Sequence, residues 1–168
     1  MKIYRGSIST IVGTINLYGD ESFLLFVEFE NGKRSSRFNN FFSPFELVDK
    51  KNDLIEKAEE ELKGYFSGKL KVFTTPVKFI TETLLSIKVF QTLLENVPFG
   101  KLISYKELSG LSGIESGARF VGNVMSRNNF PIFIPCHRVI RSDGKIGGYS
   151  NLQEIKVKLV NFERSCMI

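Results

Sequence analysis

Cys136 and His137 are the neighbouring residues of this chain best suited to carry out chemistry. His137 is the only histidine, Cys136 is one of two cysteines, and their Pro-Cys-His-Arg segment interrupts the apolar stretch Ile132–Ile140. Pro135 has no backbone N–H to donate to a sheet, so we expect it to end strand pairing and to turn Cys136 out of a regular strand. A thiol held at a strand end beside an imidazole is a candidate nucleophile.

The cysteine and histidine content argues against a metal site and against a disulfide. The two cysteines lie 30 positions apart, there is no C-x-x-C motif, and one histidine leaves too few soft ligands for structural zinc. Disulfides are rare in reducing compartments. We therefore expect no metal, and we interpret Cys166 as an incidental free thiol.

Length and composition indicate a folded globular protein. At 168 residues the chain can bury one sizeable core or two small ones. Hydrophobic residues make up 42% and charged residues 24%, which argues against disorder. No uncharged apolar segment is long enough to span a bilayer and the N-terminus lacks a signal-peptide pattern, so we expect a cytoplasmic protein without membrane contact.

Positive charge is concentrated in the second half of the chain. Residues 1–79 hold 12 Lys and Arg against 11 Asp and Glu, a net charge of +1, whereas residues 80–168 hold 11 against 7, a net charge of +4. Within residues 116–145 the count is five against one, and the one acid is Asp143. Such a cluster is expected if the partner is a polyanion; a solvated basic surface that favours solubility is the alternative.

The first half predicts a small sheet followed by a helix. Asn31-Gly32 is a strong hairpin signal, because both residues tolerate positive φ. We expect three antiparallel strands, near residues 3–17, 22–30 and 33–38. Residues 39–52 indicate a loop with a helical turn, and Asp53 indicates the N-cap of a helix that runs up to Gly68.

The run Glu59-Glu60-Glu61 falls on this predicted helix. Successive side chains on a helix point in different directions, so we expect a solvated face, with Glu59 pairing Lys63, and not a metal site. Nothing in the first half suggests catalysis.

The second half predicts mainly helices. A helix that ends near Asn96 is apolar nearly all round, which indicates a buried helix. A short helix at 106–111, a Ser-Gly turn and a second helix at 116–126 follow the helix-turn-helix pattern within the basic region. A last helix, near 152–163, ends in Glu163, which could reach the interior.

The helix predicted at 116–126 has two distinct faces. The apolar face holds Phe120, Val121, Val124 and Met125, and the other face holds Arg119, Gly122, Asn123 and Ser126. A glycine in a helix interior costs about 1 kcal/mol relative to alanine, so Gly122 needs a reason. Either the helix backbone approaches a phosphate chain at Gly122, or it packs tightly against the first half of the protein. Arg119, alone on a face of small residues, is the better functional candidate.

The segment Ile134-Pro135-Cys136-His137-Arg138-Val139, preceded by Asn128 and followed by Gly147–Ser150, resembles the O6-alkylguanine-DNA alkyltransferases. The Pro-Cys-His-Arg-Val core is highly specific to that family, and the resemblance extends from about Val89 to Glu163. It implies an α/β fold with two domains. Residues 1–76 would form a ribonuclease H-like domain with a three-stranded antiparallel sheet and a helix. Residues 80–168 would form a mainly helical, winged-helix or helix-turn-helix-like domain that binds DNA and holds the active site.

The resemblance implies DNA repair by alkyl transfer. The alkyl group of O6-alkylguanine, and also of O4-alkylthymine, would move to Cys136 once per protein molecule and without a cofactor. Cys136 would attack as the thiolate. His137 would act as the base through a water, Glu163 would orient the imidazole, and Asn128 would stabilise the turn before the cysteine.

The resemblance also implies how DNA is bound. A monomer would contact double-stranded DNA in the minor groove and flip the damaged nucleotide out of the stack. Arg119 would fill the gap that the nucleotide leaves, and Tyr105 would rotate the phosphate and donate to the base. The remaining expected DNA contacts are Ser116, Gly122, Asn123 and Arg127, and the expected pocket residues are Pro131, Val139, Gly147, Tyr149 and Ser150.

The sequence departs from the family pattern at two points and leaves other functions to weigh. Asn151 stands where several relatives have glycine, which would narrow or stiffen the pocket rim, and the first half has no Cys or His for the zinc that some relatives bind. A relative that senses lesions without repairing them is one alternative, but such relatives lack the cysteine. A Cys-His acyl hydrolase would need an oxyanion hole, which the sequence does not identify. A purely structural Cys-His pair would not explain Arg119, Tyr105 and Asn128 together.

Overall fold

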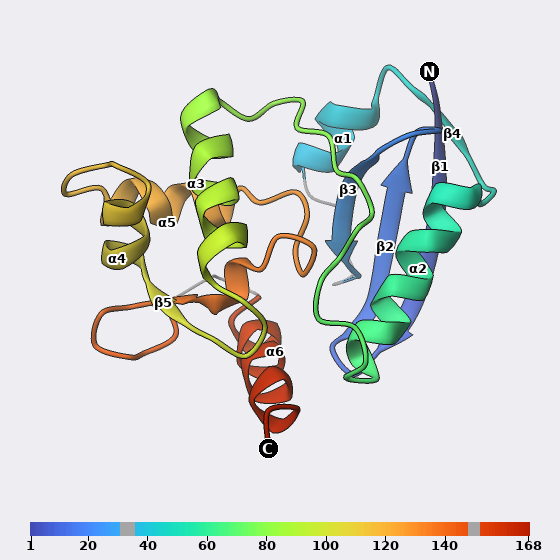
Figure 1. Cartoon of the computed structure of the whole chain (residues 1–168). Coiled ribbons are helices and arrows are strands. Elements are labelled where there is room, and N and C mark those ends of the chain that lie inside the picture. Colours follow the sequence, from blue (N-terminus) through green and yellow to red (C-terminus); the bar gives the residue numbers. More distant parts are fainter. Residues whose placement is uncertain (31–35, 148–151) are drawn as a thin grey trace. The chain divides into compact units, whose positions relative to one another are not determined.

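The structure, a computed structural model, describes residues 1–30, 36–147 and 152–168, and its contacts separate two compact units, residues 1–80 and residues 81–168 (Figure 1). Each unit has its own buried residues. Among the described residues, none of the helices has the length and apolar character needed to cross a membrane.

The first unit is built on a four-stranded mixed sheet. Its strands are β1 (Lys2–Thr10), β2 (Gly13–Gly19), β3 (Leu24–Phe29) and β4 (Glu46–Val48), in the order β3-β2-β1-β4. β1, β2 and β3 pair antiparallel, and β4 pairs with β1 in parallel. The antiparallel arrangement is the one that the sequence predicts, although the predicted strands have other bounds. The expected three-stranded sheet therefore lacks one strand. β4 has three residues, two of them exposed, and shows no alternation that would indicate a strand.

The first expected strand, residues 3–17, is in fact two strands joined by a tight turn. Gly13 has a φ of +99°, which residues with a side chain rarely adopt. Thr10 closes the turn, because its hydroxyl donates to the Gly13 carbonyl (2.7 Å) and accepts from the Val12 N–H (3.1 Å). Gly13 was the signal for this turn, but β-branched residues on both sides favoured a continuous strand.

Residues 36–42 form helix α1 (Ser36–Phe42), although the sequence predicts a strand over 33–38. Phe38 and Phe42 stand one helical turn apart with ring centroids 4.7 Å apart, and both pack against Tyr18 and Phe26 of the sheet. Phenylalanine favours strands in isolation, but burial of both rings in one cluster at i, i+4 spacing favours the helix. The predicted hairpin at Asn31-Gly32 lies outside the described residues.

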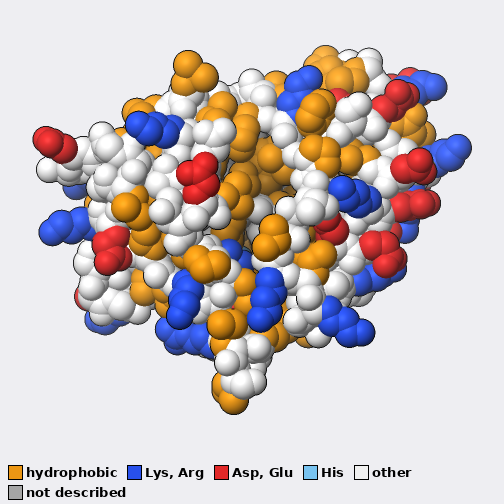
Figure 2. Space-filling model, in the orientation of Figure 1, with side chains coloured by type: hydrophobic (Ala, Val, Ile, Leu, Met, Phe, Trp, Pro, Cys, Tyr) orange, Lys and Arg blue, Asp and Glu red, His pale blue; other side chains and the backbone are white. Residues whose placement is uncertain are grey.

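Helix α2 (Asp53–Phe66) covers one face of the sheet (Figure 1). Its N-cap is Asn52 and not the expected Asp53: the Asn52 side chain accepts from the Ile55 N–H at 3.0 Å. Figure 2 shows acidic and basic side chains interspersed over the outer side of this helix, as an amphipathic surface helix requires. The apolar side chains of its buried face are Leu54, Ile55, Ala58, Leu62 and Tyr65.

The prediction that Glu59, Glu60 and Glu61 form a solvated face is wrong for two of these three residues. Glu60 is exposed, and it is Glu60, not Glu59, that pairs with Lys63 (3.0 Å). Glu59 is buried and pairs with Lys51 (2.7 Å), and Glu61 is buried as well. A helical net predicts which of three successive residues share a face, but it does not show which segment of the chain will cover that face.

Glu61 holds the chain that follows α2. Its carboxylate accepts from the N–H and hydroxyl groups of Thr74 and Thr75, at distances between 2.5 and 3.0 Å. In the part of the chain that the structure describes, no group of three acidic, histidine or cysteine side chains could hold a metal ion.

The second unit is mainly helical. Its elements are α3 (Leu84–Asn96), β5 (Ile103–Ser104), α4 (Tyr105–Leu111), α5 (Ala118–Ser126), the 3-10 turn η1 (Cys136–Arg138), β6 (Val139–Ile140) and α6 (Gln153–Ser165). α3, α4 and α5 pack on one another, and β5 and β6 pair in parallel. Because Ile103 pairs with Val139, the start of α4 lies beside the end of η1.

Local signals determine where α4 and α5 begin. Ser104 and Glu107 form a capping box at the start of α4. Between the two helices, the buried hydroxyl of Ser109 hydrogen-bonds two backbone groups of the turn. α5 begins two residues later than the sequence predicts, because Ser116 adopts a left-handed φ of +50°.

Helix α3 is not the buried helix that its apolar sequence indicates. Val89, Phe90 and Leu93 are buried, but Leu84 is 87% exposed and Leu94 is 48% exposed. Burial therefore follows one stripe of the helix, although apolar residues occur on other faces too.

Candidate active site

The stretch before Cys136 is a tight turn and not the strand that the sequence predicts. Ile132 has a φ of +74°, in the left-handed region, and the Ile134 N–H donates to the Phe130 carbonyl (2.8 Å). Asn128 bridges the turn: its Oδ1 accepts from the Phe130 N–H and its Nδ2 donates to the Ile134 carbonyl, both at 2.9 Å. A left-handed φ strains a β-branched residue, so these bonds are needed to hold the turn.

Cys136 begins the η1 turn directly after Pro135, which is the departure from a strand that the proline predicts. The Cys136 side chain is half-buried, and burial raises the pKa of its thiol. A hydrogen bond from the Asn128 side chain and the positive charge of Lys156 lower that pKa and oppose the effect of burial. The thiol is therefore protonated at rest, and its neighbours favour the thiolate once a base takes the proton.

His137 is buried and bound to a carboxylate. Its Nε2 lies 2.6 Å from Glu163 Oε1, and among the described residues its Nδ1 has no hydrogen-bond partner. Burial lowers the pKa of His137, and the contact with Glu163 offsets only part of that change, so the ring is neutral at pH 7. A carboxylate can only accept, so the single ring proton resides on Nε2. Nδ1 then carries a lone pair and can accept a proton.

The Glu163 side chain is buried, and it binds other groups in addition to His137. Arg138 donates from Nε to Oε2 and from Nη2 to Oε1, each at 3.0 Å, and the Gly100 N–H donates to Oε2 (3.0 Å). Burial raises the pKa of Glu163, but the hydrogen bonds and charges of His137 and Arg138 outweigh burial and hold that pKa at about 2. The carboxylate is therefore ionised throughout the neutral range.

Arg138 has no role in the sequence-based prediction, although it lies within the motif. It is buried, its Nη1 donates to the Val97 carbonyl (2.9 Å), and its guanidinium carbon lies 5.8 Å from the centroid of the Phe99 ring. A buried arginine needs an acidic partner. Its place in an apolar stretch was therefore a signal that Glu163 would have to neutralise it as well as orient His137.

Lys156 is the second site residue without a predicted role. It is buried, and its Nζ donates to the Val139 carbonyl (2.5 Å) and to the Tyr105 hydroxyl (3.2 Å). Burial lowers the pKa of Lys156 to about 8, while attraction to Cys136 raises it in part. Lys156 and Glu163 lie seven residues apart on the inward stripe of α6, and this spacing was the available signal.

Tyr105 lies against Gly147. A Cβ atom added to Gly147 would stand 2.9 Å from the Tyr105 hydroxyl oxygen, so a side chain at position 147 would displace the tyrosine. Gly147 is buried, and it is the last residue described before the 148–151 gap. Gly147, an expected pocket residue, thus leaves the space that the side chain of Tyr105, an expected catalytic residue, occupies.

The polar face of α5 is open. Arg119 and Asn123 are exposed, and a Cβ added to Gly122 would meet no atom of the described residues within 4 Å. Gly122 therefore leaves the surface of α5 uncovered within the second unit. A pocket of about 430 Å³ adjoins this face; its lining residues are Tyr105, Lys106, Ala118, Gly122, Arg141, Ser142 and Asp143.

The remaining predicted residues differ in how the structure places them. Exposed Ser116 and Arg127 flank α5 on either side, as its preceding turn and its C-cap. Pro131 is half-buried and bridges to Ile134, and the Val139 side chain is fully buried. Tyr149 and Ser150, together with Asn151, lie outside the described residues.

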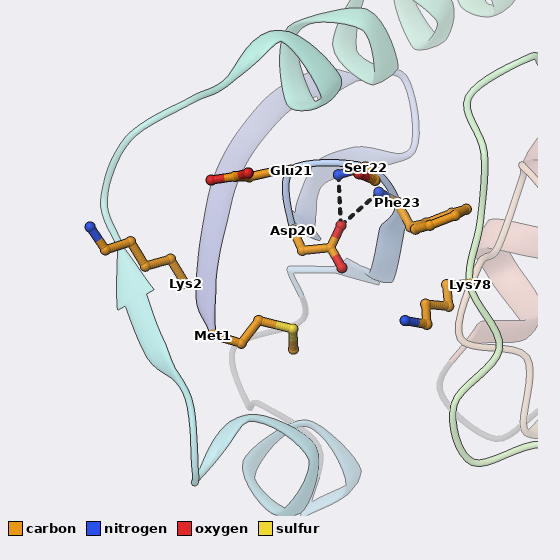
Figure 3. Close-up of a pocket in the computed structure, with 7 residues that line it drawn as sticks. All are labelled: Met1, Lys2, Asp20, Glu21, Ser22, Phe23 and Lys78. Atoms are coloured by element: carbon orange, nitrogen blue, oxygen red, sulfur yellow. Dashed lines mark hydrogen bonds between the residues drawn. The ribbon is translucent and has the colours of Figure 1, made fainter.

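A second pocket, in the first unit, does not gather the same chemistry. It measures about 450 Å³, and Figure 3 shows the side chains around it, among them Asp20, Phe23 and Lys78. The Asp20 carboxylate accepts from the Ser22 and Phe23 N–H groups (2.8 and 2.7 Å), which closes the turn after β2. Asp20 therefore has a structural task.

Comparison with known proteins gives matches along nearly the whole chain. The family model for the ribonuclease-like domain of 6-O-methylguanine DNA methyltransferase matches residues 3–79. The model for the DNA binding domain of 6-O-methylguanine DNA methyltransferase matches residues 85–165. A methylated-DNA–protein-cysteine methyltransferase of Methanosarcina acetivorans is 33% identical over 164 residues, which are 98% of this chain and 100% of the relative.

Solved structures agree with these matches. The crystal structure of Mycobacterium tuberculosis O6-methylguanine methyltransferase is 27% identical and has a TM-score of 0.84, covering 97% of this chain and 93% of that chain. The structure of the Mycobacterium tuberculosis protein in complex with DNA is also 27% identical, with a TM-score of 0.81 over 99% of this chain and 94% of that chain.

Proposed function

Because the chain belongs to the 6-O-methylguanine DNA methyltransferase family, we propose that Cys136 is the cysteine to which it transfers the alkyl group. Membership confirms the family predicted from the Pro-Cys-His-Arg-Val segment, the two-part α/β fold, and the activity of a DNA repair methyltransferase that acts on O6-methylguanine. The chain binds DNA. The residues that carry out the reaction remain the substance of the proposal.

One observation supports the proposal above all others: Glu163 fixes the proton of His137 on Nε2 and leaves Nδ1 as an acceptor next to Cys136 in the chain. Adjacent side chains point apart, so the thiol proton passes to Nδ1 through a water. The thiolate sulfur then attacks the alkyl carbon, the bond between carbon and O6 breaks, and its electron pair remains with the guanine. The imidazolium formed is stabilised by the ionised Glu163.

Lys156 and Tyr105 assist the two charges that the reaction creates. The Lys156 ammonium favours the thiolate of Cys136 by electrostatic attraction. Lys156 also donates to the Tyr105 oxygen, an arrangement that suits the tyrosine hydroxyl to act as the donor toward the leaving guanine.

The DNA is double-stranded and is bound in the minor groove by residues 80–168, with α5 as the recognition helix. Arg119 fills the stack after the damaged nucleotide flips out, and Gly122 lets the α5 backbone approach a phosphate chain. Ser116, Asn123 and Arg127 supply further contacts along α5. Residues 1–76 form the ribonuclease-like domain, and the protein acts as a monomer without a cofactor.

The substrates are O6-alkylguanine and O4-alkylthymine, and each protein molecule reacts once, because the thioether at Cys136 has no evident route of removal. A test is to incubate the protein with excess duplex that carries O6-methylguanine labelled in the methyl group and to count the label bound to protein. We expect one methyl per molecule, none in Cys136→Ser, and an unchanged count in the control Cys166→Ser. More than one methyl turned over per protein would contradict the proposal.

A further inference from the structure

We propose that the turn Arg141–Lys145 is a second phosphate-binding wall, opposite α5, and that Asp143 weakens its affinity for DNA by holding Arg141 in an ion pair. This inference rests on the proposed function, because it takes the open face of α5 as the place where DNA lies. It concerns residues outside the reacting group, and the partner is the sugar-phosphate backbone of DNA.

The pocket beside α5 has the two walls that such a contact needs. Tyr105 and Lys106 begin α4, and Gly122 leaves the α5 backbone open, because an added Cβ there would meet no described atom within 4 Å. Arg141 and Ser142 belong to the turn on the other side of the same 430 Å³ pocket. Two cationic and two hydroxyl side chains thus line this space together with Gly122, a combination that suits a phosphodiester, and Asp143 is the acid among the lining residues.

The turn presents Arg141 by a regular set of hydrogen bonds. The Arg141 N–H donates to the Lys145 carbonyl (2.9 Å), and the Gly144 N–H donates to the Arg141 carbonyl (3.0 Å). Gly144 has a φ of +80°, which a glycine adopts without strain. The turn therefore holds its shape without help from the Arg141 side chain, which remains available for a ligand.

The two carboxylate oxygens of Asp143 have different tasks. Oδ1 accepts from the Lys145 N–H (3.0 Å) and so shapes the turn, whereas Oδ2 lies 3.1 Å from Arg141 Nη2. The Arg141 and Asp143 side chains are 60% and 42% exposed. Ion pairs this exposed are weak, so a phosphate can replace the carboxylate as the partner of Arg141. The pair then acts as a restraint that DNA can overcome.

Asp143 opposes DNA in a region that otherwise favours it. Between residues 116 and 145 it is the one acid among five cations. Once Arg141 turns to a phosphate, the carboxylate stays nearby as a negative charge without a partner for Oδ2. Phosphate contacts carry no sequence information and raise affinity for all DNA alike. A restraint on one such contact lowers non-specific affinity and so helps a repair protein to leave undamaged DNA.

The experiment measures binding to an undamaged duplex by fluorescence anisotropy at several salt concentrations. Asp143→Asn keeps the Oδ1 acceptor of the turn and removes the charge, and we expect it to tighten binding about two- to fivefold. Arg141→Gln should weaken binding and reduce the slope of log K against log salt by about 0.9, the value of one phosphate contact. In the double variant, the gain from Asp143→Asn should be lost. The matched control is Asp49→Asn, which removes the same charge from an exposed pair with Arg5 (3.0 Å) in the first unit and should leave the affinity within twofold.

Three results would overturn the inference. One is unchanged or weaker binding by Asp143→Asn, and another is an unchanged salt slope in Arg141→Gln. The third is an equal gain from Asp143→Asn with and without Arg141, because the carboxylate would then repel DNA directly without restraining the arginine. Methyl transfer by the unaltered protein is measured in the same preparation. If the unaltered protein transfers the methyl group and any of these three results is found, only the inference about Asp143 and Arg141 is overturned. If the unaltered protein does not transfer the methyl group, the proposed function is overturned.

Discussion

Substitution of Glu163 by glutamine should destabilise the protein more than any exposed charge change. The Glu163 carboxylate binds His137 Nε2 at 2.6 Å, Arg138 through two hydrogen bonds at 3.0 Å, and the Gly100 N–H at 3.0 Å. Glutamine keeps the size of the side chain but removes the charge. Arg138 would then remain buried without an anion.

Two independent estimates of the loss agree. Removal of one partner from a buried ion pair costs about 3 to 5 kcal/mol. The pKa of Glu163 is held at about 2, below the ordinary 4.5, and this difference corresponds to about 3 to 4 kcal/mol at about 1.4 kcal/mol per pKa unit. We therefore expect the free energy of unfolding at pH 7 to fall by about 3 kcal/mol or more, a large part of the 5 to 15 kcal/mol that is typical of a folded domain.

The measurement is urea unfolding at pH 7 followed by circular dichroism, with Glu60→Gln as the control. Glu60 pairs with Lys63 on the surface, at 3.0 Å, and exposed pairs of this kind contribute little to stability. A Glu163→Gln variant within 1 kcal/mol of the unaltered protein would refute the reasoning, because the buried Arg138 would then be tolerated without its anion.

The same pKa shift predicts how acid acts on the unaltered protein. The pKa of Glu163 is lower in the folded chain than in the unfolded chain, so the unfolded chain binds the proton first as the pH falls. This part of the stability is present above about pH 4.5 and is lost as the pH falls toward 2. The lowered pKa of His137 acts with the same sign below pH 6.5. Glu163→Gln should lose the Glu163 part of this acid dependence.

Three further substitutions test separate contacts. Gly147→Ala should slow alkyl transfer at saturating DNA, because the new Cβ would displace the Tyr105 hydroxyl; a rate equal to that of the unaltered protein would show that this close approach is not needed. Lys156→Met should raise the pKa of Cys136 and slow transfer at pH 7 about tenfold per pKa unit, and the rate should recover at higher pH. The control Lys156→Arg keeps the positive charge and should not need a higher pH to react. A loss of rate in Lys156→Met that is the same at every pH would exclude the electrostatic role. Arg119→Ala should weaken repair of duplex DNA more than reaction with a free alkylated base, and equal losses would count against its place in the stack.

The reacting residues could be predicted from the sequence because their types are scarce and chemically distinctive. One histidine beside a cysteine, with a glutamate on the last helix, left few other ways to build the site. The sequence does not predict the roles of Arg138 and Lys156, because arginine and lysine are common residue types. Charged side chains are usually solvated, so neither residue indicates burial until the carboxylate and carbonyl that receive it are located.

The errors in the fold have a similar physical origin. The hairpin signal at Asn31-Gly32 predicts a strand that includes Phe38, but the shared aromatic cluster of Phe38 and Phe42 favours the helix α1. The sequence does not predict the turn at Ile132, because β-branched residues rarely adopt a φ such as +74°. This turn depends on Asn128, whose side chain hydrogen-bonds the backbone of Phe130 and of Ile134. The apolar sequence around these residues indicates a strand.

The most direct test of the central claim is the mass of two peptides. The protein is mixed with an oligonucleotide that contains O6-methylguanine and is then digested, and the peptides that carry Cys136 and Cys166 are weighed. We predict that the Cys136 peptide gains one methyl group, that the Cys166 peptide does not change, and that Cys136→Ala abolishes the gain. An unmodified Cys136 in protein that binds the lesion tightly, or a methyl group found on Cys166, would contradict the account.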